Sequence, residues 1–163
     1  MINFRKPKKI DISGLIKLSK EYSLESRWGH LIPVGQIYHI EEAKQNLLGN
    51  KIYECRIAEK EGNMIGYIAV KNHKKCYEAS ILVDSDYRKQ GIGKELTDIA
   101  FKNIPSDVEV EAWVADFNKT SLKATPKMGF EFKRKVFETN FITDKNFYIH
   151  IFSRSGDLQK RDD

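Results

Sequence analysis

The chain has 163 residues, 40% of them hydrophobic and 31% charged. This is the composition of one globular domain with its own core, and it excludes a disordered chain. The formal net charge of +5 suits an anionic partner, but the lysines and arginines are scattered, which argues against a nucleic-acid-binding protein. No apolar run approaches the roughly 18–20 residues that span a bilayer, and the first residues lack the apolar stretch of a signal peptide. We therefore expect no membrane contact and a cytoplasmic location.

The first half of the chain predicts a strand, two helices and then a run of extended segments. A short strand at Phe4 ends before Pro7, and Asp11 or Ser13 caps a helix with apolar residues at helical spacing. The pattern is less clear over residues 23–50, where Gly29, Pro33 and Gly35 interrupt it. The remaining elements of this half are a helix over 40–48 ended by Gly49, strands over 52–58 and 64–70 that form a hairpin, and a third strand over 77–83.

The second half alternates helices and strands. We predict a helix up to Phe101, a strand over 108–114, a short helix over 118–127, and strands over 130–140 and 147–152, with a frayed end from Arg154 onward. The complete order, β-α-α-β-β-β-α-β-α-β-β, predicts a mixed α/β (α+β) domain whose sheet is mostly antiparallel. We expect one domain over 1–152 and a polar C-terminal tail over 153–163.

A glycine-containing loop, Arg88–Lys94 (the glycine loop), joins the third strand of the run to the next helix. Free N–H groups and the positive dipole at a helix N-terminus bind phosphate, and glycine lets the backbone approach a pyrophosphate closely. The spacing is neither G-x-G-x-x-G nor G-x-x-x-x-G-K-[ST], so it indicates neither a dinucleotide fold nor an NTPase phosphate loop.

Two segments resemble the motifs of the GNAT acetyltransferase superfamily. Ile81–Lys94 is similar to motif A, a strand ending in an apolar-Val-Asp sequence followed by [R/Q]-x-x-G-x-[G/A], and Asn118–Phe130 is similar to motif B. The resemblance implies a sheet splayed at an acetyl-CoA site. It also implies an N-acetyltransferase that moves the acetyl group of acetyl-CoA to a primary amine by direct attack in a ternary complex.

The same resemblance implies the residues that bind acetyl-CoA. The backbone of Leu82 and Val83 is expected to pair with the pantetheine arm, and the N–H groups of the glycine loop to hold the pyrophosphate. Asn118 is expected to contact the cofactor, and it suits a helix N-cap equally well. The full expected set is Ile81, Leu82, Val83, Arg88, Lys89, Gln90, Gly91, Ile92, Gly93, Lys94 and Asn118.

The candidate catalytic residues are Glu111, Glu78 and Thr125. Where many family members carry the tyrosine that protonates the CoA thiolate, this chain has Thr125, so Tyr148, Tyr77 or water is the alternative acid, or the thiolate leaves unassisted. An amine must lose a proton before it attacks, and a carboxylate is the natural base. We favour Glu111 slightly over Glu78.

Several other assignments follow or stay open. The segment that includes Trp28, Gly29, His30 and Tyr38 is a candidate for acceptor contact, with core packing as the alternative. The histidines lack metal-ligand spacing, so we expect no metal, and Cys55 and Cys76 are expected to be buried, reduced thiols. Cys76 stays open as a nucleophile because it is close to the strand of motif A.

The expected partners are acetyl-CoA and an amine acceptor, small molecule or protein, and a homodimer stays open. Two alternative functions remain. One is an acetyl-CoA sensor or interaction protein that does not catalyse transfer, and the other is nucleic-acid binding through the basic charge.

Overall fold

The computed structural model describes residues 1–25, 40–73, 75–140 and 145–159, and its elements follow the predicted order. They are β1 (Asn3–Arg5), α1 (Asp11–Glu25), α2 (Ile40–Leu48), β2 (Ile52–Lys60), β3 (Asn63–His73), β4 (Cys76–Val83), the 3-10 helix η2 (Ser85–Tyr87), α3 (Ile92–Phe101), β5 (Glu109–Ala115), α4 (Lys119–Lys127), β6 (Glu131–Asn140) and β7 (Lys145–Ser155). The mixed α/β class is confirmed.

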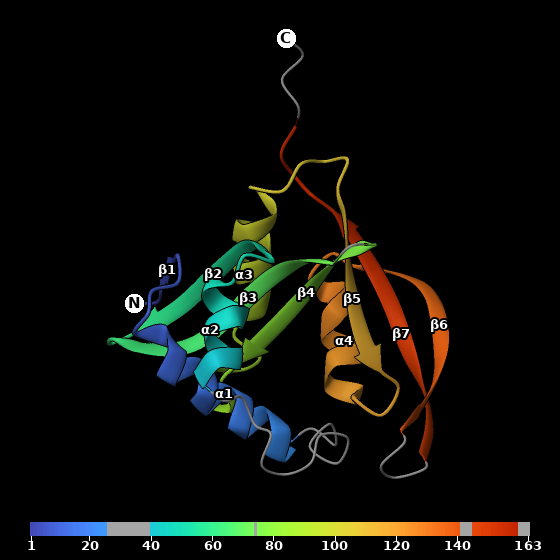
Figure 1. Ribbon diagram of the computed structural model, residues 1–163, viewed down its shortest axis with the longest axis horizontal. Coiled ribbons are helices and arrows are strands. Elements are labelled where there is room, and N and C mark those ends of the chain that lie inside the picture. The colour runs from blue at the N-terminus through green and yellow to red at the C-terminus, as the bar shows by residue number, and fades with distance from the viewer. Residues whose placement is uncertain (26–39, 74, 141–144, 160–163) are drawn as a thin grey trace.

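The strands form one seven-stranded sheet in the order β1-β2-β3-β4-β5-β7-β6 (Figure 1). Every neighbouring pair is antiparallel except β4 and β5, which run parallel and are joined by the crossover helix α3. The predicted hairpin of β2 and β3 turns through Glu61 and Gly62, whose φ angles of 52° and 78° suit a tight two-residue turn.

Two cores lie on opposite faces of the sheet, because successive side chains of a strand point to opposite sides. Along β3, Ile68 and Val70 belong to the core under α3, whereas Tyr67 and Ala69 belong to the core under α1 and α2. Figure 1 shows α1 and α2 on one side of β2–β4 and α3 on the other. None of the described helices combines the length and the apolar character that a membrane span requires.

The C-terminal segment is more ordered than the sequence suggests. Strand β7 continues to Ser155, past the expected limit at residue 152, and Arg154 donates hydrogen bonds to Asp98, Asp157 and the carbonyl of Met128. Leu158 then forms an isolated bridge with Pro105. The prediction of a frayed end from Arg154 was therefore wrong over residues 154–158, because polar side chains there have partners that are distant in sequence.

Candidate active site

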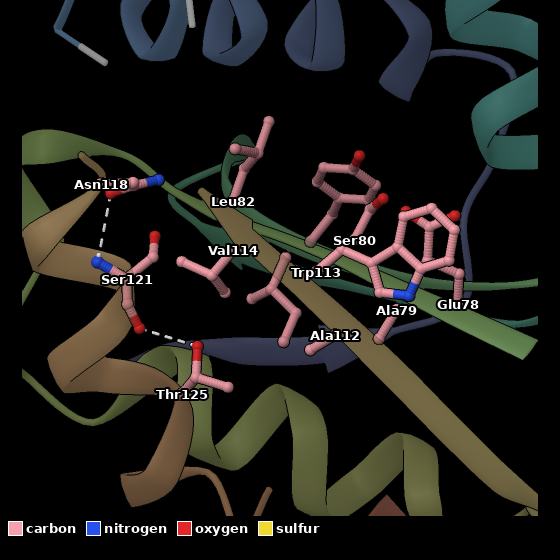
Figure 2. A pocket seen from close by; sticks show the side chains of 12 residues that line it. Glu78, Ala79, Ser80, Leu82, Ala112, Trp113, Val114, Asn118, Ser121 and Thr125 are labelled. Carbon is pink, nitrogen blue, oxygen red and sulfur yellow. Dashed lines mark hydrogen bonds between the residues drawn. The ribbon is translucent and has the colours of Figure 1, made fainter. Parts of the chain in front are cut away.

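Strands β4 and β5 separate soon after they begin. Their register contains two pairs, Tyr77 with Val110 and Glu78 with Glu111, and beyond these residues the strands point apart (Figure 1). A cleft opens between them, and residues of α4 and its N-cap form part of its wall (Figure 2). The cleft is lined by Tyr67, Glu78, Ala79, Ser80, Ile81, Leu82, Ala112, Trp113, Val114, Asn118, Ser121 and Thr125.

The backbone of β4 presents hydrogen-bonding groups to this cleft. The N–H of Asp84 donates to Ile65 on β3 at 2.9 Å, so by alternation the N–H and C=O groups of Val83 and Ile81 point away from β3. The carbonyl of Val83 accepts from Nε of Arg88 at 3.1 Å, as this orientation requires. The backbone of Leu82 faces β3 and its side chain lines the cleft. Of the two residues expected to pair with the pantetheine arm, only Val83 directs its backbone groups away from β3, as Ile81 also does.

The glycine loop is the strand-to-helix turn that the sequence predicts. Lys89 and Gly91 have positive φ angles of 61° and 81°, and α3 begins directly afterwards at Ile92. The first N–H groups of α3 have no carbonyl one turn earlier, as at any helix start. A Cβ at Gly91 would meet no atom of the protein within 4 Å, so the loop is open on the side of this glycine. The loop thus offers N–H groups and helix dipole to an anion.

Two of the three basic side chains of the loop, those of Arg88 and Lys94, have partners within the protein. Arg88 is held by Val83, and Lys94 pairs with Asp98 one helical turn later at 2.5 Å. Burial opposes ionisation of Asp98, yet hydrogen bonds from Lys94 and Arg154 hold its pKa below the ordinary value. The loop therefore relies on its backbone N–H groups as much as on its basic side chains.

Helix α4 contributes a cap and a hydroxyl to the cleft. The side chain of Asn118 accepts from the N–H of Ser121 at 3.2 Å, which confirms its expected role as the N-cap. Thr125 lies in the cleft wall but is 3% exposed, and its hydroxyl donates to the Ser121 carbonyl at 2.7 Å (Figure 2). Its proton is thus committed to the helix backbone.

The two tyrosines considered as acids lie elsewhere. Tyr77 packs against the core under α3 and its ring meets Tyr53, with centroids 5.2 Å apart. Tyr148 is on β7, 46% exposed, and its ring contacts Phe137. Among the described residues, the tyrosine that lines the cleft is the buried Tyr67. The sequence did not identify it as a site residue, because the alternation of β3 only assigns it to one face of the sheet.

The two candidate bases are neighbours in register but differ in surroundings. Glu78 lines the cleft, and its carboxylate lies 2.9 Å from Nε2 of His73. The carboxylate of Glu111 accepts from Nε1 of Trp113 at 2.7 Å and from Arg134 at 3.3 Å. Glu111 is not among the described residues that form the cleft wall, where Trp113 stands instead (Figure 2).

Neither cysteine is prepared to act as a nucleophile. Cys55 is buried as predicted, and burial raises the pKa of its thiol to about 12. Cys76 is only half-buried, which corrects the expectation of a buried thiol. Burial, reinforced by Glu111 and Glu78, raises the pKa of the Cys76 thiol, so the reactive thiolate is disfavoured. The acceptor candidates Trp28, Gly29, His30 and Tyr38 lie outside the described residues.

Comparison with known proteins agrees with this architecture. A family model described as "Acetyltransferase (GNAT) domain" matches residues 32–149. No curated protein matches the sequence.

Solved structures similar to this one include three acetyltransferases. An N-acetyltransferase from Staphylococcus aureus is 16% identical with a TM-score of 0.72, covering 95% of this chain and 98% of that one. A ribosomal-protein-alanine N-acetyltransferase from Brucella melitensis is 18% identical with a TM-score of 0.72, covering 94% and 99%. A GNAT superfamily phosphinothricin acetyltransferase from Sinorhizobium meliloti, solved with acetyl-CoA, is 18% identical with a TM-score of 0.75, covering 95% and 88%.

The family match covers most of the chain, and the splayed strands, open glycine loop and free backbone groups fit acetyl-CoA as the co-substrate. The chain therefore belongs to the GNAT acetyltransferase family and is an acetyl-CoA-dependent acyltransferase.

Proposed function

We propose that this enzyme is an N-acetyltransferase that moves the acetyl group of acetyl-CoA to a primary amine by direct attack in a ternary complex. The observation that carries the proposal is the composition of one cleft wall. Strand β4 places the carboxylate of Glu78 and the outward backbone groups of Ile81 and Val83 along the same opening. A base and a thioester site thus lie on one rigid strand.

Acetyl-CoA would lie along β4 with its pyrophosphate at the glycine loop. The amide groups of the pantetheine arm suit the outward N–H and C=O groups of Ile81 and the outward N–H of Val83, as an added strand does. A backbone N–H at this point also suits the thioester carbonyl, whose oxygen gains negative charge during attack. The N–H groups from Lys89 to Lys94 would hold the pyrophosphate, and Asn118 borders the cleft on the side of α4.

We assign the base to Glu78 rather than to Glu111. An alkylamine with a pKa of about 10 is mostly protonated at neutral pH, so its proton must move to a base before or during attack. The carboxylate of Glu78 opens into the cleft, whereas the two oxygens of Glu111 are occupied by Trp113 and Arg134. Glu111 would instead fix the position of the Trp113 indole at the cleft mouth.

We assign no side chain as the acid that protonates the leaving group. The Thr125 hydroxyl already donates a hydrogen bond to the carbonyl of Ser121, and a threonine hydroxyl is a far weaker acid than a phenol. Because a thiol has a pKa of only about 8.5, the CoA thiolate can leave unassisted or take a proton from water. The raised pKa of the Cys76 thiol favours direct transfer over a covalent enzyme intermediate.

The test is amine-dependent CoA release by the purified protein over a panel of amines, comparing wild type with Glu78→Gln and Glu111→Gln. We expect Glu78→Gln to lower kcat by about 100-fold or more, because general-base catalysis contributes roughly 10²–10⁴-fold. Glu111→Gln keeps an oxygen acceptor for Trp113 and should have a much smaller effect. Acetyl-CoA binding, measured by calorimetry, should be unchanged in both variants.

Two outcomes would contradict the proposal. Equal activity of Glu78→Gln and wild type would remove Glu78 as the base. Tight acetyl-CoA binding without release for any small amine, peptide N-terminus or lysine peptide would favour the sensor interpretation over transfer.

A further inference from the structure

We infer that His73 is a positioning residue for the catalytic base: its imidazole holds the carboxylate of Glu78 in the orientation that faces the cleft. The inference rests on the proposed assignment of Glu78 as the base. It concerns a residue on the neighbouring strand that lies in neither of the two sequence motifs.

The pairing of β3 with β4 brings the two side chains together. His73 is the last residue of β3 and pairs in register with Cys76, so Glu78 is its diagonal neighbour on the same face of the sheet. Nε2 of His73 lies 2.9 Å from Oε2 of Glu78. The histidine side chain is 42% exposed and the glutamate 27% exposed, so both groups are partly accessible to solvent.

Two other charged residues, Lys71 and Glu111, lie opposite Glu78 on the neighbouring strands, but neither forms an ion pair with its carboxylate. Lys71 lies opposite Glu78 on β3, where burial lowers the pKa of its ammonium against the opposing effect of Glu78. Glu111 lies opposite on β5 and repels the Glu78 carboxylate, while its own oxygens are bound by Trp113 and Arg134. Among the described residues, the nitrogen within ion-pair distance of the Glu78 carboxylate is Nε2 of His73.

The physical consequence is a restricted carboxylate. A glutamate side chain has three rotatable bonds. Without a partner it must be ordered in each catalytic cycle, and this ordering costs conformational entropy. A contact at one carboxylate oxygen fixes the side chain and leaves the second oxygen for the amine proton. This second oxygen then accepts the proton, the amine nitrogen forms its bond to the acetyl carbon, and the C–S bond breaks to release the CoA thiolate.

The experiment is a double-mutant cycle on amine-dependent CoA release with His73→Ala, Glu78→Gln and the double variant. We expect His73→Ala to lower kcat by about tenfold, a coupling typical of residues in direct contact, with the acetyl-CoA affinity unchanged. His73→Gln keeps an N–H donor near the position of Nε2 and should restore the rate to within about threefold of wild type. In the Glu78→Gln background, His73→Ala should cost nothing further.

Asn72→Ala is the matched control, because Asn72 is the exposed neighbour of His73 and alternation points its side chain to the opposite face. It should keep the wild-type rate, and melting curves should show all variants folded. Wild-type activity of His73→Ala, or an equal loss from it in the Glu78→Gln background, would overturn the inference while leaving the base assignment intact. Wild-type activity of Glu78→Gln would overturn both.

Discussion

Gly91 and Gly93 lie two residues apart in the glycine loop, but their surroundings differ. Gly91 caps α3 in the left-handed conformation, with φ 81° and open space where a Cβ would stand. Gly93 is inside the helix, and a Cβ there would touch Sδ of Met128 at 3.5 Å and the side chain of Val83. A side chain at Gly91 would therefore project into open space beside the loop, where we place the pyrophosphate, whereas one at Gly93 would point toward Met128 and Val83.

This difference leads to a prediction for Gly91→Trp. A Cβ at this position meets no protein atom within 4 Å, so we expect the folded state to lose only the roughly 1–2 kcal/mol that a left-handed residue other than glycine costs. Acetyl-CoA affinity, measured by calorimetry, should fall by at least about 100-fold, equivalent to roughly 2.8 kcal/mol, because the indole occupies the pyrophosphate position.

Gly62→Trp is the control, since Gly62 has φ 78° and equally open surroundings in the hairpin of β2 and β3. The two variants should melt at similar temperatures, and Gly62→Trp should bind acetyl-CoA like wild type. Undiminished binding by Gly91→Trp would place the pyrophosphate elsewhere.

The first strand and first helix are joined by one partly buried cluster of charged side chains. The guanidinium of Arg5 on β1 binds both carboxylate oxygens of Asp11, the first residue of α1, and also binds Glu59 on β2. Asp11 is 4% exposed and accepts a further hydrogen bond from the N–H of Lys8. Burial opposes its ionisation, but Arg5 and Lys8 hold its pKa below the ordinary value.

Asp11→Asn should therefore destabilise the protein in a pH-dependent way. Hydrogen bonds to a charged group contribute about 1.5–3 kcal/mol, so the free energy of unfolding should fall by about 2 kcal/mol at neutral pH. A carboxyl with a lowered folded-state pKa stabilises fully above its ordinary pKa of about 3.9, and this stabilisation is lost as the pH falls through the folded-state value. The difference from wild type should thus shrink below about pH 4.

Urea unfolding over a pH series measures this difference, with the exposed Glu131 as the comparison position. Glu131→Gln should change the free energy of unfolding by less than about 0.5 kcal/mol throughout. A penalty for Asp11→Asn that stayed constant down to pH 3 would contradict the assignment of the stabilisation to the ionised carboxylate.

At the scale of the whole molecule, the C-terminal segment holds two helices of the domain together. The guanidinium of Arg154 lies 4.5 Å from the centre of the Phe101 ring and binds both Asp98 of α3 and the Met128 carbonyl at the end of α4. One side chain of β7 thereby connects the two helices that border the glycine loop and the cleft. The domain depends on residues beyond 152 for this connection.

Gly156, in the same C-terminal segment, packs closely against the backbone of residues 104 and 105. A Cβ there would lie 2.1 Å from the carbonyl oxygen of Ile104 and 2.4 Å from that of Pro105, both backbone atoms that cannot rotate aside. Gly156→Ala should lower the free energy of unfolding by at least about 2 kcal/mol, within the range for overpacked sites. Thermal and urea unfolding measure the effect, with the exposed neighbour Ser155→Ala as control. Equal stability of the two variants would show that residues beyond 152 do not secure the domain.

Local patterns along the chain were enough to predict the order of the elements, the turn at the glycine loop and the cap at Asn118. The physical reason is that these features depend on residues close in sequence. Periodicity defines a helix or strand, a glycine supports a positive φ, and an asparagine side chain reaches the N–H three residues ahead. The alternation in β5 likewise placed Glu111 and Trp113 on one face before any tertiary contact was known.

The tertiary structure alone decided which of these groups enter the cleft. Glu78 and Glu111 are equivalent as strand glutamates, and only the contacts with Trp113 and Arg134 separate Glu111 from the opening. The outward backbone of Ile81 follows from the pairing of β4 with β3, and the partners of Arg154 come from helices far away in sequence. Such outcomes depend on how strands diverge and where distant side chains meet, which no pattern of neighbouring residues contains.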